Sequence, residues 1–98
     1  MVINKQRSGD TLTIAPEGRL DTVTSPELEK AVKGSLDGVT ELIFDLAGLE
    51  YISSAGLRVL LSSQKIMNGK GSMKVIHVNE MIAEVFEITG FTDILTIE

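Results

Sequence analysis

Apolar side chains recur along this chain with two different periods, and the clearest of them is helical. Between residues 54 and 68, one side of the pattern recurs at helical spacing and comprises Leu57, Leu60, Leu61, Gln64 and Met67. Arg58, Ser62 and Lys65 fill the opposite side. This arrangement is typical of an amphipathic helix with one buried stripe. The glycines of "NGKG" at residues 68–71 predict its end.

A shorter helix is predicted to begin between residues 24 and 26. Thr24 with Glu27 fits a capping box, in which each side chain bonds the backbone N–H of the other residue. Alternatively, Ser25 caps the helix and Pro26 takes its first position, where a missing N–H costs nothing. The buried face of this helix would then comprise Leu28, Ala31, Val32, Ser35 and Leu36.

A third helix is predicted between Asn79 and Gly90. Asn79 has a side chain suited to an N-cap, and Gly90 has the conformational freedom that helix ends often need. Its buried face would comprise Ile82, Val85 and Phe86.

Short apolar or alternating runs predict five strands, at residues 2–6, 11–15, 42–46, 73–78 and 94–97. The turn residues of "SGD" at 8–10 predict a hairpin between the first two. Connections this short leave no room for a second domain, so residues 1–98 are expected to form one α/β domain. We expect a mixed central β-sheet with the amphipathic helices packed on one face. The pattern leaves the strand order open.

Composition and charge narrow the possible partners. The 98 residues include 43% hydrophobic and 23% charged side chains, which suits one globular domain. A net charge of -5 disfavours phosphate backbones and anionic lipid, so we expect no direct nucleic acid contact and no membrane insertion. The chain has no cysteine, no apolar leader and no long apolar run, which together favour a cytoplasmic protein.

The motifs of catalysis and metal binding are all incomplete. The stretch 52–56, "ISSAG", lacks the first glycine of a nucleophile elbow, and the single histidine, His77, lies in a strand pattern. "GKGS" at 69–72 follows a helix and lacks the spacing of a phosphate loop. One histidine and no cysteine leave no metal ligand set. We therefore expect no catalytic residues, no cofactor, no metal and no enzyme activity.

What remains unexplained is a pair of serines, Ser53 and Ser54, between a strand pattern and a helix start. The stretch "LIFDLAGLEYISSAGLRVLL" at residues 42–61 resembles the STAS domain of the anti-sigma factor antagonist type. That family runs from a strand through D-L to Y/F-[MI]-[DS]-S-[STA]-G-L and a helix. "GRLDTVTSPEL" at 18–28 is similar to its G-E-L-D segment, and "VFEITGFTDIL" at 85–95 is similar to its F-x-x-T-G ending. The resemblance spans essentially the whole chain.

The resemblance implies that Ser54 is a phosphorylation site. In such antagonists, the serine after the [DS] position is phosphorylated by a partner kinase that is itself an anti-sigma factor. Ser53 stands at the aspartate position and is kept as the alternative acceptor, whereas Ala55 removes a competing hydroxyl. The unphosphorylated protein would bind the serine kinase and free a sigma factor. Phosphorylation would end that binding, and a phosphoserine phosphatase would restore it.

The helix start gives this expectation a physical basis. As an N-cap, Ser54 would accept a hydrogen bond from the N–H of Gly56 or Leu57, and capping is also its plainest alternative role. A phosphate there would be held by the positive end of the helix. Asp21, which matches the family aspartate, is expected near the same sheet edge, either facing a basic group of the kinase or shaping a turn.

The residues expected to contact a partner therefore lie in two segments. They are Asp21, Thr22, Thr24, Ser25, Ser53, Ser54, Ala55, Gly56 and Arg58. A second function stays open at this point, that of a STAS accessory subunit of a membrane transport complex. In that role the same face would dock on an ATPase and no phosphate would be transferred.

Overall fold

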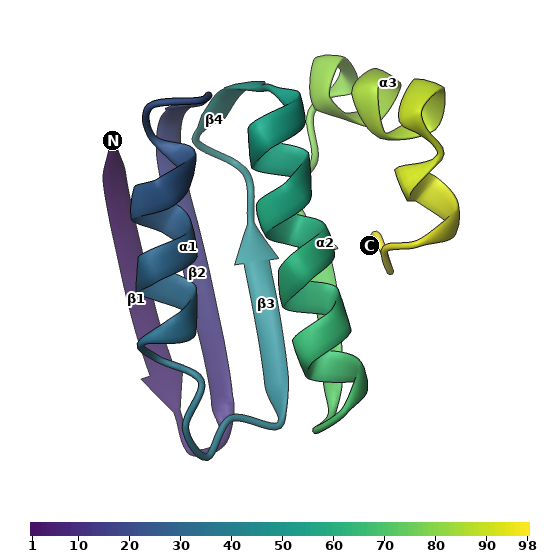
Figure 1. Ribbon diagram of the computed structural model, residues 1–98. Coiled ribbons are helices and arrows are strands. Elements are labelled where there is room, and N and C mark those ends of the chain that lie inside the picture. The colour runs from purple at the N-terminus through teal and green to yellow at the C-terminus, as the bar shows by residue number, and fades with distance from the viewer.

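The longest strand, β2 (Thr11–Leu20), joins the rest of the sheet together in the computed structural model, which describes residues 1–98. It pairs antiparallel with β1 (Val2–Ser8) on one side and parallel with β3 (Glu41–Asp45) on the other. β5 (Ser72–Ile76) lies parallel to β3 on its far side, and β4 (Leu49–Ile52) pairs with the end of β2. The order is thus β1-β2-β3-β5, with β4 beside the last residues of β2 (Figure 1).

The helices build a second layer on this sheet. α1 (Ser25–Lys33) and α2 (Ser54–Asn68) run across one face, and α3 (Glu80–Thr89) lies beside the top of α2 (Figure 1). A short 3-10 helix, η1 (Phe91–Asp93), follows α3. The predicted fold class, a mixed sheet with amphipathic helices on one face, is confirmed. No helix of the chain combines the length and the apolar character that crossing a bilayer requires.

One hydrophobic core lies between the two layers. In β3, Leu42 and Phe44 are fully buried while Ile43 between them is only half-buried, so the helices cover a single face of the strand. The core comprises 21 buried apolar residues and includes Ile82 and Phe86 of α3. Burial of this apolar surface is the main favourable contribution to folding.

The sequence pattern did not predict β4. This strand has four residues, and its buried positions, Leu49 and Ile52, stand at its two ends rather than alternating. It pairs with β2 across an irregular register between Gly18 and Arg19. A strand this short and irregular has no period-two signal to detect.

The strand predicted at residues 94–97 is wrong. Gly90 ends α3 with a left-handed φ of 81°, as expected, but the chain then turns through η1 and buries Leu95 in the core. Only one bridge to β5 remains, from Ile97 to Val75. In that bridge the Val75 N–H donates to the carbonyl of Thr96 over 2.8 Å. The burial of Leu95 in the core takes the place of a longer ladder.

Candidate functional site

The start of α2 is fixed directly against the end of β2. The backbone N–H of Ser53 donates to the carbonyl oxygen of Leu20 over 2.9 Å. Two residues into the helix, Gly56 is buried, and a Cβ added to it would lie 2.7 Å from Leu20 Cγ and 2.8 Å from Ile52 Cγ1. Only glycine lets the helix approach the sheet this closely without displacing those side chains.

The two serines occupy different positions at this helix start. The structure corrects the expectation that Ser54 caps α2, because Ser54 is the first helical residue and Ser53 is the N-cap. Ser53 has the extended backbone of a cap, with φ -98° and ψ 176°, but its hydroxyl makes no capping hydrogen bond. Its Oγ is buried without a partner, whereas Ser54 is exposed. Ser54 therefore presents the accessible hydroxyl of the pair.

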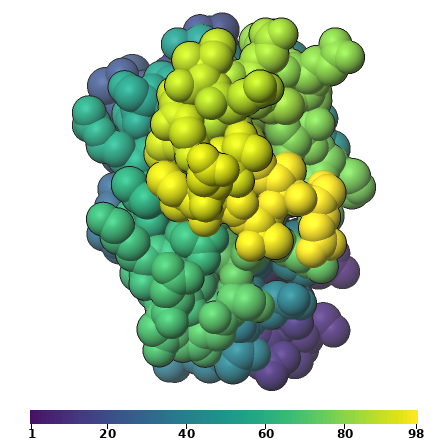
Figure 2. Space-filling view, turned by 90° about the vertical axis from the view of Figure 1, so that its right-hand side faces the viewer, coloured from purple at the N-terminus to yellow at the C-terminus, as the bar shows by residue number.

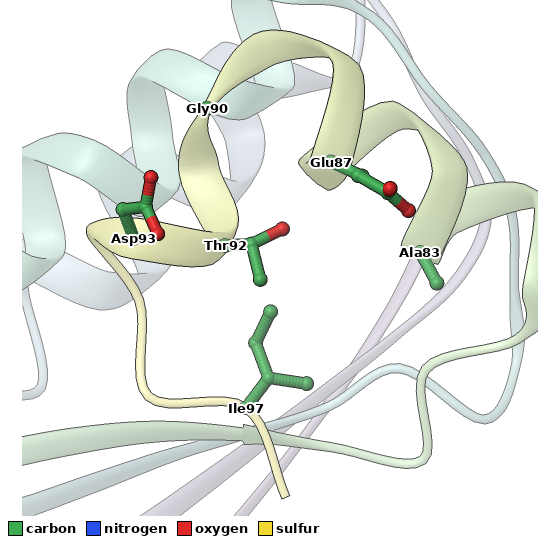
Figure 3. Close-up of a pocket in the computed structure, with 6 residues that line it drawn as sticks. All are labelled: Ala83, Glu87, Gly90, Thr92, Asp93 and Ile97. Carbon is green, nitrogen blue, oxygen red and sulfur yellow. The ribbon is translucent and has the colours of Figure 1, made fainter.

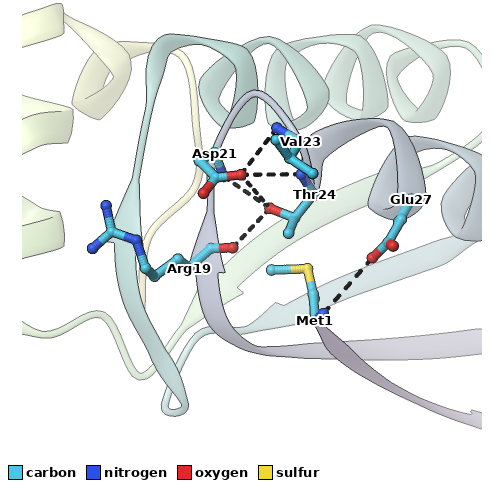
Figure 4. A network of polar contacts seen from close by, with 6 residues as sticks. All are labelled: Met1, Arg19, Asp21, Val23, Thr24 and Glu27. Atoms are coloured by element: carbon cyan, nitrogen blue, oxygen red, sulfur yellow. Dashed lines mark hydrogen bonds and ion pairs between the residues drawn. The ribbon is translucent and has the colours of Figure 1, made fainter.

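A turn formed by residues 21–24 lies next to the serines in the structure, because Asp21 directly follows Leu20. Figure 4 shows Asp21 pointing back into this turn, where its Oδ1 accepts from the N–H groups of Val23 (3.0 Å) and Thr24 (3.1 Å). The Thr24 hydroxyl donates to the carbonyl of Arg19 over 2.7 Å and accepts from the Asp21 N–H. We call Ser53, Ser54 and this turn the serine site.

The hydrogen bonds of this turn act on the charge of Asp21. The N–H of Thr24 holds the pKa of the Asp21 carboxyl below its ordinary value, and the Val23 N–H adds to this effect. Partial burial acts against it, and Arg19 nearby acts with it. Of the two roles expected for Asp21, shaping the turn is the one that its contacts show.

Neither of the two capping arrangements expected for α1 forms. Thr24 is at the N-cap position, but its hydroxyl is used by Arg19 and Asp21, so no capping box with Glu27 exists. Ser25 begins the helix, and Pro26 follows it within the first turn. The turn that precedes the helix thus takes the hydroxyl that the capping box would have needed.

Most of the expected contact residues gather at one edge of the molecule. Thr22, Ser54 and Arg58 are exposed there, and Asp21, Thr24, Ser53 and Ala55 are partly exposed. Ser25 and Gly56 differ from the others, because Ser25 is 3% exposed at the start of α1 and Gly56 packs on Leu20. Both are buried, so we leave them out of the surface proposed for a partner.

The list of expected contacts omits one exposed residue of the turn, Val23. Its side chain is 80% exposed, although the hydrogen bond from its N–H to Asp21 fixes its backbone. A single apolar residue in a polar loop gives no periodic signal, so the sequence pattern could not identify its exposure.

A second carboxylate with a polar partner, that of Asp45, lies at the end of β3. His77 does not continue β5 as predicted, since it has a positive φ of 58° and its Nδ1 lies 2.9 Å from Asp45 Oδ1. Burial raises the pKa of Asp45, but the hydrogen bonds from His77 and from the N–H of Ala47 outweigh it, so the pKa lies below its ordinary value. This pair joins the ends of two neighbouring strands.

The known proteins that this chain resembles in sequence all indicate the same family. The family model of the STAS domain matches residues 2–98. BtrV of Bordetella bronchiseptica, named as a candidate anti-sigma factor antagonist, is 34% identical over 83 residues, or 83% of this chain and 72% of that one. The anti-sigma-B factor antagonist of Staphylococcus epidermidis is 32% identical over 80 residues, or 80% of this chain and 74% of that one.

Solved structures agree with the observed architecture. An anti-sigma factor antagonist from Mycobacterium paratuberculosis has a TM-score of 0.89 at 21% identity, covering 98% of this chain and 83% of that one. SpoIIAA of Bacillus in its phosphorylated form has a TM-score of 0.77 at 16% identity, covering 99% of this chain and 91% of that one. At these identities the similarity establishes the fold. From the family match and the sequence relatives together, this chain belongs to the anti-sigma factor antagonist family of STAS domain proteins.

Proposed function

We propose that this chain is an anti-sigma factor antagonist controlled by phosphorylation of Ser54. In its unphosphorylated form it binds a serine kinase anti-sigma factor in the cytoplasm, and a sigma factor is released. The kinase phosphorylates Ser54 and the complex dissociates, until a phosphoserine phosphatase removes the phosphate. The chain itself is a binding protein and performs no catalysis in this cycle.

The observation that supports this proposal most strongly is the difference between the two serines. A kinase must reach the hydroxyl oxygen, and Ser54 is exposed whereas the Ser53 Oγ is buried. Phosphorylation of Ser53 would first require its buried hydroxyl to become exposed. Accessibility and the family pattern thus select the same residue.

The start of α2 is also suited to hold the phosphate once it is attached. The first N–H groups of an α-helix have no intrahelical partner, and an anion near them is stabilised by about 0.3–1 kcal/mol. Because the Ser53 side chain makes no cap, it does not compete for them. Arg58 follows Ser54 by four residues, the spacing at which side chains meet on one helix face. A phosphate on Ser54 can therefore pair with this exposed guanidinium.

Phosphorylation then acts on the complex through the surface rather than through the fold. The partner's surface would fit the neutral hydroxyl of Ser54. It would have to exclude or desolvate the phosphate, which carries about -1.5 to -2 charges. Desolvating this charge is costly, and each 1.4 kcal/mol corresponds to about a tenfold loss of affinity. The names of the relatives favour this role over that of a transport complex subunit. No observation supports the transport role.

The test is incubation with a purified serine kinase anti-sigma factor and ATP, followed by fragment-ion mass spectrometry. We expect one phosphate per chain, on Ser54. Ser54→Ala should abolish labelling, and the matched variant Ser53→Ala should keep it. Labelling of Ser54→Ala at an unchanged rate would contradict the assignment and point to Ser53.

A further inference from the structure

The net charge of the chain is concentrated in its last quarter. Residues 1–74 contain nine basic and nine acidic side chains, so that part of the chain is neutral. Residues 75–98 contain five acidic side chains and no lysine or arginine, and therefore carry the whole net charge of -5. Of these five, only Glu98 makes an ion pair, with Lys74. The carboxylates of Glu80, Glu84, Glu87 and Asp93 have no partner within the chain.

The same segment exposes most of the large apolar side chains found at the surface. Five such side chains are exposed in the whole molecule, and three of them are Met81, Ile88 and Ile94. Ile88, in the last turns of α3, is 84% exposed. No other helix exposes a large apolar side chain. Isolated exposed apolar residues are common, but a group of them beside unpaired charges is typical of an interaction surface.

Helical geometry arranges these residues in rows on α3. At about 100° per residue, Met81 and Ile88 project in nearly the same direction, and Ile82 and Phe86 point into the core. The acidic residues Glu80, Glu84 and Glu87 form the adjacent row. We call these five residues at positions 80, 81, 84, 87 and 88 the α3 face. It places an apolar row next to an acidic row, on the side of the helix away from the core.

A groove borders the α3 face on its acidic side. Its lining residues are Ala83, Glu87, Gly90, Thr92, Asp93 and Ile97, and its volume is about 560 Å³. Figure 3 shows Thr92 reaching from η1 toward α3, with Ile97 beneath it and Ala83 and Glu87 opposite. Figure 2 shows the C-terminal segment, in yellow, at the surface of the upper and middle part of the molecule. The groove thus combines an apolar floor with an anionic wall.

We propose that the α3 face and this groove form a second docking surface, which binds a basic amphipathic helix of a protein partner. The partner's apolar side chains would cover Met81 and Ile88. Its arginine or lysine side chains would pair with the row of glutamates, and one of them would lie in the groove with its methylene groups on Ile97 and its charge at Glu87. A basic partner is specified because every charge available here is negative.

This surface is formed by α3 and η1, whereas the serine site is formed by the start of α2 and the turn at 21–24. The proposal therefore does not depend on the phosphorylation of Ser54. A second copy of this chain is a poorer occupant, because its basic residues are balanced by acidic ones and are spread over residues 1–74. Apolar and charge complementarity both favour a separate, basic protein segment.

The test is an NMR titration of the whole ¹⁵N-labelled chain with a synthetic helical peptide of about 14 residues, with a leucine stripe flanked by arginines. We expect amide shifts confined to residues 80–98. Two control peptides, one with the same composition but no stripe and one with glutamate in place of arginine, should bind at least about tenfold more weakly. Binding should also weaken when the salt concentration rises from about 50 to about 300 mM.

Paired variants distinguish peptide binding at the α3 face from nonspecific attraction between opposite charges. Glu84→Gln with Glu87→Gln should weaken peptide binding about tenfold or more, and Ile88→Ser should weaken it comparably. Asp10→Asn with Asp37→Asn removes the same charge from two exposed turn residues and should leave binding unchanged. Equal losses in the two double variants, shifts centred on Ser54, or equal binding of the control peptides would overturn the proposal. Concentration-dependent dimerisation lost in Ile88→Ser would overturn it in favour of a second copy.

Discussion

The Ser53 N–H and the carbonyl oxygen of Leu20 are joined by a 2.9 Å hydrogen bond that fixes the start of α2 to the end of β2. This bond places two segments more than thirty residues apart in the sequence at one edge of the sheet. The serine pair and the Asp21 turn therefore lie side by side in one site. Its geometry depends on the close contact between α2 and β2.

The close contact can be tested at Gly56. In Gly56→Ala the new methyl group would lie 2.7–2.8 Å from side-chain atoms of Leu20 and Ile52. Overpacking of this kind costs about 1–3 kcal/mol, and 1 kcal/mol lowers the Tm of a domain of this size by about 4–8 °C. We expect a Tm reduced by at least about 4 °C in calorimetry. Gly69→Ala is the control, because its Cβ would meet only Ile66 O at 3.6 Å, and equal Tm values for the two variants would refute this account.

Two variants separate the hydrogen bonds that Asp21 accepts in the turn from the negative charge that it carries. Asp21→Ala removes the acceptor of the Val23 and Thr24 N–H groups, so we expect its Tm to fall by a few degrees. Asp21→Asn keeps an oxygen at that position and loses only the charge, so its Tm should lie between those of Asp21→Ala and the parent. Thermal melts followed by circular dichroism give the comparison. An Asp21→Ala protein as stable as the parent would show that the turn does not need this side chain.

The stability of the folded protein should depend on pH through the ionisation of Asp45. The pKa of Asp45 is lowered in the folded protein by His77 and the Ala47 N–H, against the effect of burial, from an ordinary value of 3.8. The ionised carboxylate therefore stabilises the folded state above that value, and this contribution is lost as the pH falls through the lower folded-state pKa. We expect the parent to have a higher Tm than Asp45→Asn at pH 7 and the difference to shrink toward about pH 3. A difference that stays constant over this range would contradict the assignment.

The periodic parts of the fold were predictable, and the irregular parts were not. The apolar stripe of α2, the Asn79 cap and the end of α3 at Gly90 each follow from residue type and spacing, and Asn79 Oδ1 does accept from the Ile82 N–H. β4 lacks alternation because its buried residues stand at its ends. The chain beyond Gly90 contains enough apolar residues for a strand, but the position of Leu95 in the core diverts it into η1.

The candidate site was predictable as a location and less so in its detail. The family pattern identified the serine pair, but a shift of one residue in the helix start decides which hydroxyl is buried, and helix boundaries are not predictable to one residue from a sequence. The burial of Ser25 and the exposure of Val23 depend on how the turn at 21–24 folds. The turn-shaping role of Asp21 was one of two expected roles, whereas the hydrogen bond from the Thr24 hydroxyl to the Arg19 carbonyl was not expected.

The central claim is that phosphorylation of Ser54 changes the binding surface and leaves the fold intact. The most direct test is calorimetric titration of the serine kinase anti-sigma factor with the unphosphorylated and the Ser54-phosphorylated chain, alongside the Tm of each form. We predict that phosphorylation weakens binding by about a hundredfold or more while the Tm stays within a few degrees, and that Ser54→Asp has the same effect less completely. Equal affinities for the two forms, or a large drop in Tm on phosphorylation, would contradict this account.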